Sequence, residues 1–276
     1  MKIISDIISS RNNPTVKWAA SLATKKGRDA ATSFIAEGEK LTIEALDAAL
    51  PVTHLFVSES KRVQLVEKLE PYFNAKSFEK TELITLSDSA FDKISTEMSP
   101  QGVISVIKYL DFFRDADIIY KEDFFSSSCE RLIFLSSVRD PGNLGAVIRS
   151  AAAFGVDHII LTADSADLYN PKTVRSAMGS LFRVKATVVS DACAVVRALI
   201  ENGRRVFAAE LSDGARSVFD VALTASDVII IGNEGHGIPS ELSETCTGSV
   251  YIPISKKTES LNAAVAAAVF MWEQSK

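Results

Sequence analysis

Residues 132–155 read LIFLSSVRDPGNLGAVIRSAAAFG. An apolar run leads into a Pro-Gly turn, and apolar side chains then recur at helical spacing, at Leu144, Val147, Ile148 and Ala151. This pattern predicts a buried strand followed by a helix. We expect Asn143 to cap the start of the helix and Gly155 to end it.

Further apolar runs alternate with helical stretches through the rest of the second half, at residues 158–161, 206–209, 228–231 and 250–254. The run at 228–231 is Val-Ile-Ile-Ile, continuous rather than alternating, which is typical of a parallel strand covered on both faces. The alternation predicts a doubly wound α/β sheet, in which ligands bind beyond the carboxyl ends of the strands.

The first part of the chain predicts a smaller α/β domain. Four short apolar runs have the character of strands, at residues 34–36, 55–57, 83–86 and 103–107, and residues 39–50 carry a helical apolar stripe. We therefore expect two domains, 1–108 and 131–276, joined by a boundary region at 109–130.

Composition limits the class of protein. The 276 residues carry a net charge of −5, but residues 1–28 hold six basic residues and one acidic residue, a net charge of +5. This basic segment suggests a local phosphate contact, although a solvated helical face would look the same. The sequence has no apolar run long enough for a membrane helix, no typical signal peptide, and three cysteines and three histidines without metal-ligand spacing. It predicts a cytoplasmic protein that binds no metal and no membrane.

Polar and glycine residues gather where the predicted strands end. Residues 232–239 read GNEGHGIP, and three glycines in six residues let a backbone approach a ligand closely. This is not the dinucleotide-binding pattern GxGxxG. Ser260 is a natural helix cap before an alanine-rich stretch in which apolar residues recur, at Leu261, Val265, Val269 and Trp272. Such a helix suits close packing against another helix, either within the chain or across a dimer.

Three segments resemble the SpoU (TrmH) family of RNA ribose 2′-O-methyltransferases. They are DPGNLG with IRSA and FG in residues 140–155, GNEGHGI in 232–238, and IPI with ESLNAAVA in 252–266. Residues 171–184 between them, and SRNNP, FIAEGE and PQG in the first half, also look like the family. The resemblance covers nearly the whole chain in order.

The resemblance implies a knotted SPOUT-type parallel-sheet domain (a trefoil knot) behind a small L30e-like RNA-binding domain. It implies a homodimer with a shared active site and S-adenosylmethionine as the methyl donor. The residues implied around the reacting ribose are Asn143, Arg149, Glu234, Ser260 and Asn262. Those implied in the cofactor pocket are Gly232, Ile252, Leu261, Glu210 and Leu211. Those expected to contact RNA are Arg11, Asn12, Lys17, Lys25 and Lys26. Lys256 departs from the glycine that family members usually carry there.

Large-subunit ribosomal RNA is the expected substrate, because an additional domain offers docking surface for a large folded RNA. Two alternatives remain on the same fold: a transfer-RNA ribose methyltransferase and a non-catalytic RNA-binding protein. A nucleotide-dependent oxidoreductase is the least favoured alternative, because the GxGxxG pattern is missing. Arg149 is expected to grip a phosphate rather than act as a base, because the pKa of arginine lies above about 12.

Overall fold

The computed structural model describes residues 1–110, 130–276 and the backbone of residues 113–115. The chain folds into two compact units. Unit 1 comprises residues 1–110 with 167–182, and unit 2 comprises residues 111–166 with 183–276. Most of the expected boundary region 109–130 lies outside the described residues.

Unit 1 contains a mixed five-stranded sheet in the order β1-β4-β3-β5-β2. The strands are β1 (Lys2–Ile3), β2 (Ser33–Glu37), β3 (Val52–Ser58), β4 (Glu82–Leu86) and β5 (Val103–Lys108). The helices are α1 (Pro14–Ser21), α2 (Lys25–Ala31), α3 (Glu39–Asp47), α4 (Arg62–Leu69), α5 (Asp88–Ile94) and α8 (Pro171–Ala177). Short 3₁₀ turns are η1 (Glu59–Lys61), η2 (Glu70–Tyr72), η3 (Lys76–Phe78) and η5 (Met178–Phe182). The four strands and the helix expected in this half are present.

Residues 167–182 belong to unit 1 although they lie in the second half of the sequence. The ring of Tyr169 stacks on Tyr109 with centroids 4.2 Å apart, and lies 4.6 Å from the ring of Phe34. The Tyr169 hydroxyl accepts a hydrogen bond from the Leu110 backbone N–H at 2.7 Å. Asp167 pairs with the buried guanidinium of Arg28. A prediction based on consecutive residues could not have found this assignment, because these interactions join positions far apart in the chain.

Unit 2 contains an eight-stranded sheet in the order β11-β13-β10-β12-β7-β8-β9-β6. The strands are β6 (Phe113–Asp115), β7 (Leu132–Leu135), β8 (His158–Thr162), β9 (Lys185–Val189), β10 (Val206–Ala209), β11 (Arg216–Ser217), β12 (Val228–Ile231) and β13 (Gly248–Tyr251). Every neighbouring pair is parallel, as the continuous apolar runs predict. The edge strands β6 and β11 and the strand β9 were not expected from the sequence.

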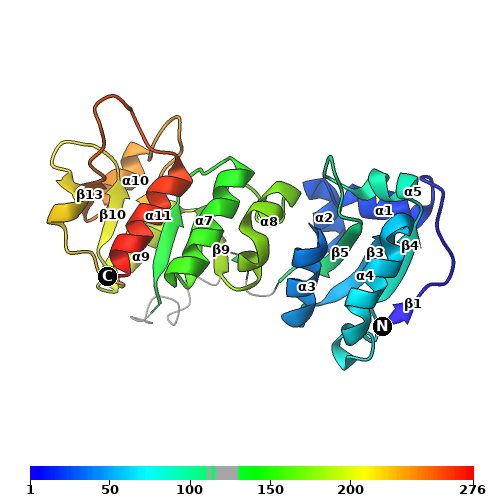
Figure 1. The fold of residues 1–276 in the computed structure, drawn as a ribbon. Coiled ribbons are helices and arrows are strands. Elements are labelled where there is room, and N and C mark those ends of the chain that lie inside the picture. The colour runs from blue at the N-terminus through cyan, green and yellow to red at the C-terminus, as the bar shows by residue number, and fades with distance from the viewer. Residues whose placement is uncertain (111–112, 116–129) are drawn as a thin grey trace. The chain divides into compact units, whose positions relative to one another are not determined.

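Helices cover both faces of this sheet. They are α7 (Pro141–Phe154), α9 (Ala192–Glu201), α10 (Ser240–Thr245) and α11 (Ala263–Gln274), with a 3₁₀ turn η6 (Val218–Asp220). Helices α7 and α11 lie side by side, and α9 packs with α10 (Figure 1). The side chains Leu144, Val147, Ile148 and Ala151 are buried on α7, as predicted.

The apolar stripe expected on α11 was wrong. Val265 and Trp272 are about half exposed, while Ala267, Phe270 and Met271 are buried. The buried face combines alanines, which let α11 approach α7 closely, with Phe270 and Met271, and it leaves Val265 and Trp272 outside. Among the described residues, no helix is long and apolar enough to cross a membrane.

Candidate active site

Three of the five residues expected around the ribose form one hydrogen-bonded chain. The Asn143 side-chain amide donates from Nδ2 to Oε1 of Glu234, and Asn143 Oδ1 accepts from Nδ2 of Asn262 at 3.0 Å. Asn143 lies in the first turn of α7, Glu234 in the loop after β12, and Asn262 at the start of α11. The amide of Asn143 is held from both ends, which sets its orientation.

Asp140 caps α7, and the expectation that Asn143 does so was wrong. Pro141 occupies the first position of the helix, and Asp140 Oδ1 accepts from the Asn143 backbone N–H at 2.9 Å. Proline suits that position because it has no N–H to satisfy and its φ is already helical. The Asn143 side chain is therefore free to bond elsewhere. Gly155 ends the helix with a left-handed φ of 69°, as predicted.

Asn262, not Ser260, caps α11. Its Oδ1 accepts from the backbone N–H groups of Ala264 at 2.9 Å and Val265 at 3.3 Å, while its Nδ2 binds Asn143. Asparagine carries a separate acceptor and donor on one side chain, so it can cap the helix with Oδ1 and donate to Asn143 with Nδ2. Ser260 is exposed two residues earlier.

Asn233 shapes the loop that carries Glu234. Its Oδ1 accepts from the backbone N–H groups of Gly235 at 2.8 Å and His236 at 3.2 Å, and its Nδ2 donates to the Ser137 carbonyl at 2.8 Å. The backbones of Asn233 and Gly237 exchange two hydrogen bonds at 2.9 and 3.0 Å. The bond to Ser137 attaches the loop to the end of β7. Asn233 was missed from the sequence, although it stands beside the expected Glu234.

The neighbouring backbone leaves no room for a side chain at Gly232. A Cβ built on Gly232 would lie 2.5 Å from the carbonyl carbon of Gly237 and 2.8 Å from Cγ1 of Ile238. The returning loop by itself explains the need for glycine here, and the expected close approach of a ligand to Gly232 stays a prediction.

Arg149 and Ser260 do not join the cluster within one chain. Both side chains are exposed, and among the described residues neither has a hydrogen bond or ion pair to Asn143, Glu234 or Asn262. The guanidinium of Arg149 is free to contact a ligand or a second chain.

The residues expected to hold the cofactor lie at three neighbouring strand ends. Glu210 and Leu211 follow β10, Gly232 follows β12, and Ile252 follows β13 with Leu261 at the end of the same loop. Because β12, β10 and β13 are adjacent in the parallel sheet, their carboxyl ends share one edge. Leu211 is 82% exposed, and Ile252 and Leu261 are half-buried. Partly exposed aliphatic side chains among backbone polar groups fit a ligand with an apolar heterocycle and polar substituents, such as an adenosine.

The five residues expected to contact RNA are all exposed in unit 1. Arg11, Asn12 and Lys17 line an open hollow of about 490 Å³ together with Lys93 of α5, which the sequence did not indicate. Lys25 and Lys26 lie in the first turn of α2. Arg28, counted in the same basic segment, is buried and binds the carbonyls of Leu22 and Ala23, so it cannot contact RNA.

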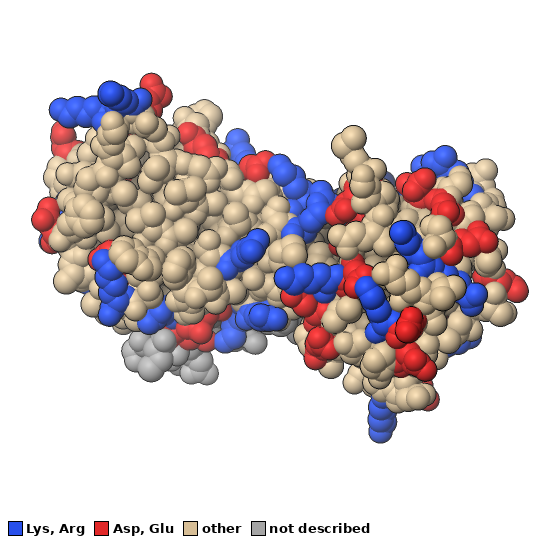
Figure 2. Space-filling model, viewed as in Figure 1, with Lys and Arg blue, Asp and Glu red and all other residues tan. Residues whose placement is uncertain are grey.

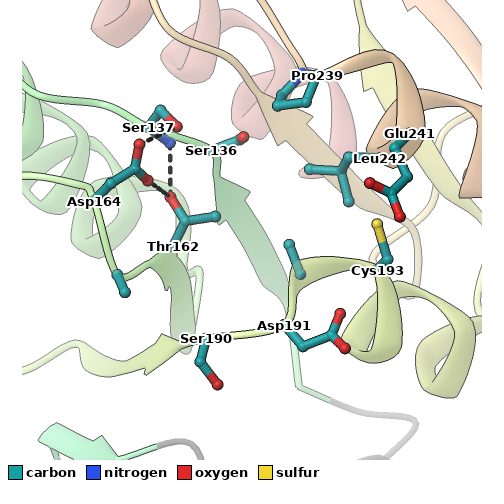
Figure 3. Close-up of a pocket in the computed structure, with 12 residues that line it drawn as sticks. Ser136, Ser137, Thr162, Asp164, Ser190, Asp191, Cys193, Pro239, Glu241 and Leu242 are labelled. Carbon is teal, nitrogen blue, oxygen red and sulfur yellow. Dashed lines mark hydrogen bonds between the residues drawn. The ribbon is translucent and has the colours of Figure 1, made fainter.

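A second group of polar residues was also missed. Figure 3 shows Asp164, after β8, receiving hydrogen bonds from Ser137 and Thr162. These bonds, with the Arg139 guanidinium at 3.0 Å, lower the pKa of Asp164 to about 2. Ser137 adopts a φ of 57°, a region that non-glycine residues seldom occupy. Its carbonyl accepts from Asn233, so the network connects the ends of β7 and β8 with the loop of Glu234.

Two family models match separate parts of the chain. Residues 130–272 match the SpoU rRNA Methylase family, and residues 13–105 match the MRM3-like substrate binding domain. The chain belongs to the SpoU rRNA Methylase family. It is therefore a methyltransferase, and the nucleotide-dependent oxidoreductase considered from the sequence is excluded.

Relatives match along the whole length. The chain is 31% identical to the 23S rRNA (guanosine(2553)-2′-O)-methyltransferase RlmP of Bacillus subtilis, over 96% of this chain and 97% of that protein. It is 28% identical to the 23S rRNA (uridine(2479)-2′-O)-methyltransferase of Streptomyces viridochromogenes, over 96% and 90%.

Solved structures of methyltransferases are similar to this chain over nearly its whole length. An AdoMet-bound rRNA methyltransferase from Sinorhizobium meliloti superimposes with a TM-score of 0.79 at 29% identity, covering 99% of this chain and 97% of that one. AviRb from Streptomyces viridochromogenes, in complex with the cofactor AdoMet, has a TM-score of 0.76 at 27% identity, with 95% and 98% covered. These comparisons confirm the predicted fold class, a SPOUT-type domain preceded in the sequence by a substrate-binding domain.

Proposed function

We propose that this SpoU methylase transfers a methyl group from S-adenosylmethionine to a ribose 2′-hydroxyl of large-subunit ribosomal RNA. The observation that carries the proposal is the chain from Glu234 through Asn143 to Asn262 at the carboxyl edge of the parallel sheet. Two full-length relatives bear the name of 23S rRNA 2′-O-methyltransferase, which supports this substrate over transfer RNA.

S-adenosylmethionine, bound at the ends of β10, β12 and β13, supplies an electrophilic methyl group. The protein must then hold the ribose so that the 2′-oxygen approaches that methyl group in line. Glu234 uses Oε1 to bind Asn143, which leaves Oε2 to accept a hydrogen bond from a ribose hydroxyl. Because Asn143 and Asn262 fix this carboxylate in place, it is preorganised before RNA binds.

Arg149 completes the site as a phosphate clamp. An arginine guanidinium is a planar two-point donor, which suits a phosphate better than it suits the role of a base. Its positive charge stabilises the developing negative charge on the 2′-oxygen. Proton transfer then goes to that phosphate or to water.

We infer that two chains share the site. Arg149 has no hydrogen bond or ion pair to the other described site residues of its own chain, and α11 leaves Val265 and Trp272 about half exposed. The face of unit 2 over α7 and α11 carries few charged side chains (Figure 2). We expect a homodimer that covers this face to bring Arg149 of one chain to the site of its partner. Sedimentation velocity checks the proposal, since a monomer at micromolar concentration would contradict it.

Unit 1 provides RNA docking through the hollow of Arg11, Asn12, Lys17 and Lys93. The proposed location is the cytoplasm, which fits a ribosomal RNA substrate.

The test is ribose-methylation mapping of total RNA from cells with and without this protein. One 2′-O-methylated nucleotide of large-subunit RNA should be lost in the deletion and restored by the purified enzyme with S-adenosylmethionine. Loss of a transfer-RNA ribose methyl group would redirect the substrate, and a base-methylated product would overturn the reaction.

A further inference from the structure

A pocket of about 560 Å³ lies beyond the carboxyl ends of β7, β8 and β9. These strand ends form one wall, and the starts of α9 and α10 form the other (Figure 3). Its volume is within the range of small-molecule sites. No step of the proposed methyl transfer uses it.

The lining repels phosphate and attracts hydrogen-bond donors. Asp164, Asp191 and Glu241 line the pocket, and no lysine or arginine does so in the part of the chain that the structure describes. Both oxygens of Asp164 already accept hydrogen bonds, from Thr162, Ser137 and the paired guanidinium of Arg139, so the acceptors open to a ligand are those of Asp191 and Glu241. Asp191 uses Oδ1 to cap α9, by accepting from the Ala194 N–H at 2.8 Å, and its second oxygen is available. A ligand here must present N–H groups rather than acidic oxygens.

A buried hydroxyl in the lining has no partner. Ser136 at the end of β7 is 1% exposed, and its Oγ has no hydrogen-bond partner among the described residues. In Figure 3 this side chain extends towards the part of the pocket that carries Leu242. A buried polar atom without a partner costs free energy, so a ligand that bonds to it recovers that cost.

Apolar side chains in the lining suit a flat ring, beside the hydroxyls of Ser137, Thr162 and Ser190. Pro239 and Leu242 contribute apolar surface on the side of α10, and Ala163 and Ala192 contribute small side chains from the end of β8 and the start of α9. Proteins hold an unstacked nucleobase between apolar or aromatic side chains and bind its Watson–Crick edge with polar groups.

The pocket shares lining residues with a hollow beside the loop that carries Glu234. A smaller hollow of about 290 Å³ shares Ser137, Asp164 and Pro239 with it and is also lined by Asn233 and His236. Asn233 and His236 stand on either side of Glu234 and Gly235 in the chain. Arg139 lines this smaller hollow too, beside Asn233 and His236.

We propose that the pocket takes the base of the nucleotide being methylated, and that it selects guanine. Guanine presents an imino N–H and an amino group side by side, which match carboxylate and hydroxyl acceptors. Uracil places one N–H between two carbonyl oxygens, which the carboxylates repel. The inference rests on the proposed 2′-O-methylation and adds the identity of the base.

The test compares guanosine with inosine, which lacks only the 2-amino group. Both are placed at the mapped position of a synthetic RNA fragment, and kcat/KM is measured for wild type and for Asp191→Asn. Asparagine retains the capping oxygen of α9, so the variant should fold. Wild type should prefer guanosine by at least about tenfold, the value of one hydrogen bond to a charged group. The preference should fall towards onefold in Asp191→Asn.

Two further variants test the buried hydroxyl and control for changes elsewhere on α9. Ser136→Ala should lower kcat/KM on guanosine RNA several-fold while leaving S-adenosylmethionine affinity unchanged in calorimetry. Glu201→Gln, at the opposite end of α9 and outside the pocket, should behave as wild type in both measurements.

Equal kcat/KM on guanosine and inosine RNA, or a mapped target other than guanosine, overturns the base pocket while 2′-O-methylation stands. Absence of any ribose methylation with bound S-adenosylmethionine overturns the proposed function and the pocket together.

Discussion

The role of Asn143 depends on its neutral side-chain amide, which donates one hydrogen bond and accepts another. It donates to a carboxylate and accepts from another amide, so it contacts both Glu234 and Asn262. An aspartate of almost the same shape would place two carboxylates in contact and leave Glu234 without its donor.

Asn143→Asp should therefore reduce kcat/KM by roughly 100-fold, a loss of about 2–3 kcal/mol, because the carboxylate of Glu234 moves away from its like charge. Single-turnover methylation of the RNA fragment measures this. Asn170→Asp is the matched control, since Asn170 caps α8 through an oxygen that aspartate also provides. Equal activity of the Asn143 variant and the control would contradict the role of the amide.

Arg149→Lys tests the phosphate clamp. Lysine keeps the charge but loses the planar fork, so catalysis should fall by about 2–4 kcal/mol while S-adenosylmethionine affinity is unchanged. Arg197→Lys on the exposed side of α9 is the control. Wild-type turnover of Arg149→Lys would refute the clamp.

At the scale of elements, hydrogen bonds join the loop after β12 to the ends of β7 and β8. Asn233 attaches the loop to Ser137, and Asp164 holds Ser137 in its left-handed conformation. The position of Glu234 is thus determined by two strand ends that are distant in sequence.

Gly232→Ala should displace this loop. The added Cβ meets the backbone of Gly237, which cannot move without breaking the paired bonds to Asn233. We expect S-adenosylmethionine affinity to fall at least about tenfold, about 1.4 kcal/mol, by isothermal calorimetry. Gly235→Ala lies in the same loop, where a Cβ would come no closer than 3.4 Å to Asn233 Oδ1, and should bind normally. Unchanged affinity in Gly232→Ala would show that the loop adapts.

The Asp164 network should contribute stability that depends on pH. The pKa of Asp164 is about 2 in the folded protein, below the usual value of 3.8, so the charged form is favoured by folding. The contribution is present above about pH 4 and is lost as pH falls towards the folded pKa. The difference in urea midpoint between wild type and Asp164→Asn should shrink over that interval. A difference that is constant with pH would contradict the assignment, and Asp213→Asn, an exposed control, should show no such trend.

At the scale of the whole molecule, the residues proposed to dock RNA belong to unit 1 and those proposed to act in methyl transfer belong to unit 2. Unit 1 includes residues 167–182, whose Leu168 and Tyr169 are buried. A truncation that removes residues 1–108 would uncover these side chains, so substitution is the cleaner way to remove RNA docking.

Replacing Arg11, Lys17 and Lys93 together by glutamine should weaken RNA binding and leave S-adenosylmethionine affinity intact. If each contacts one phosphate, the slope of log affinity against log salt should fall by about 2–3 units, at roughly 0.7–0.9 per contact. Glutamine at Lys76, Lys80 and Lys108, exposed elsewhere in unit 1, removes the same charge and should leave the slope unchanged. An equal change in both triple variants would indicate that net charge, not the hollow, binds RNA.

The resemblance of three segments to the SpoU family indicated which residues meet at the site. The sequence by itself also determined the parallel arrangement and five of the eight described strands of unit 2, and four of the five strands of unit 1. Local patterns suffice for these features, because a strand buried on both faces needs a continuous apolar run and a helix needs an apolar stripe. Only the tertiary structure decided which polar side chain caps which helix, because Pro141 and the second hydrogen bond of Asn262 change that choice. It also decided that Gly232 accommodates Gly237, that Arg149 stands apart from Asn143, and that residues 167–182 join unit 1. Each depends on atoms brought together from distant positions in the chain, which no local spacing records.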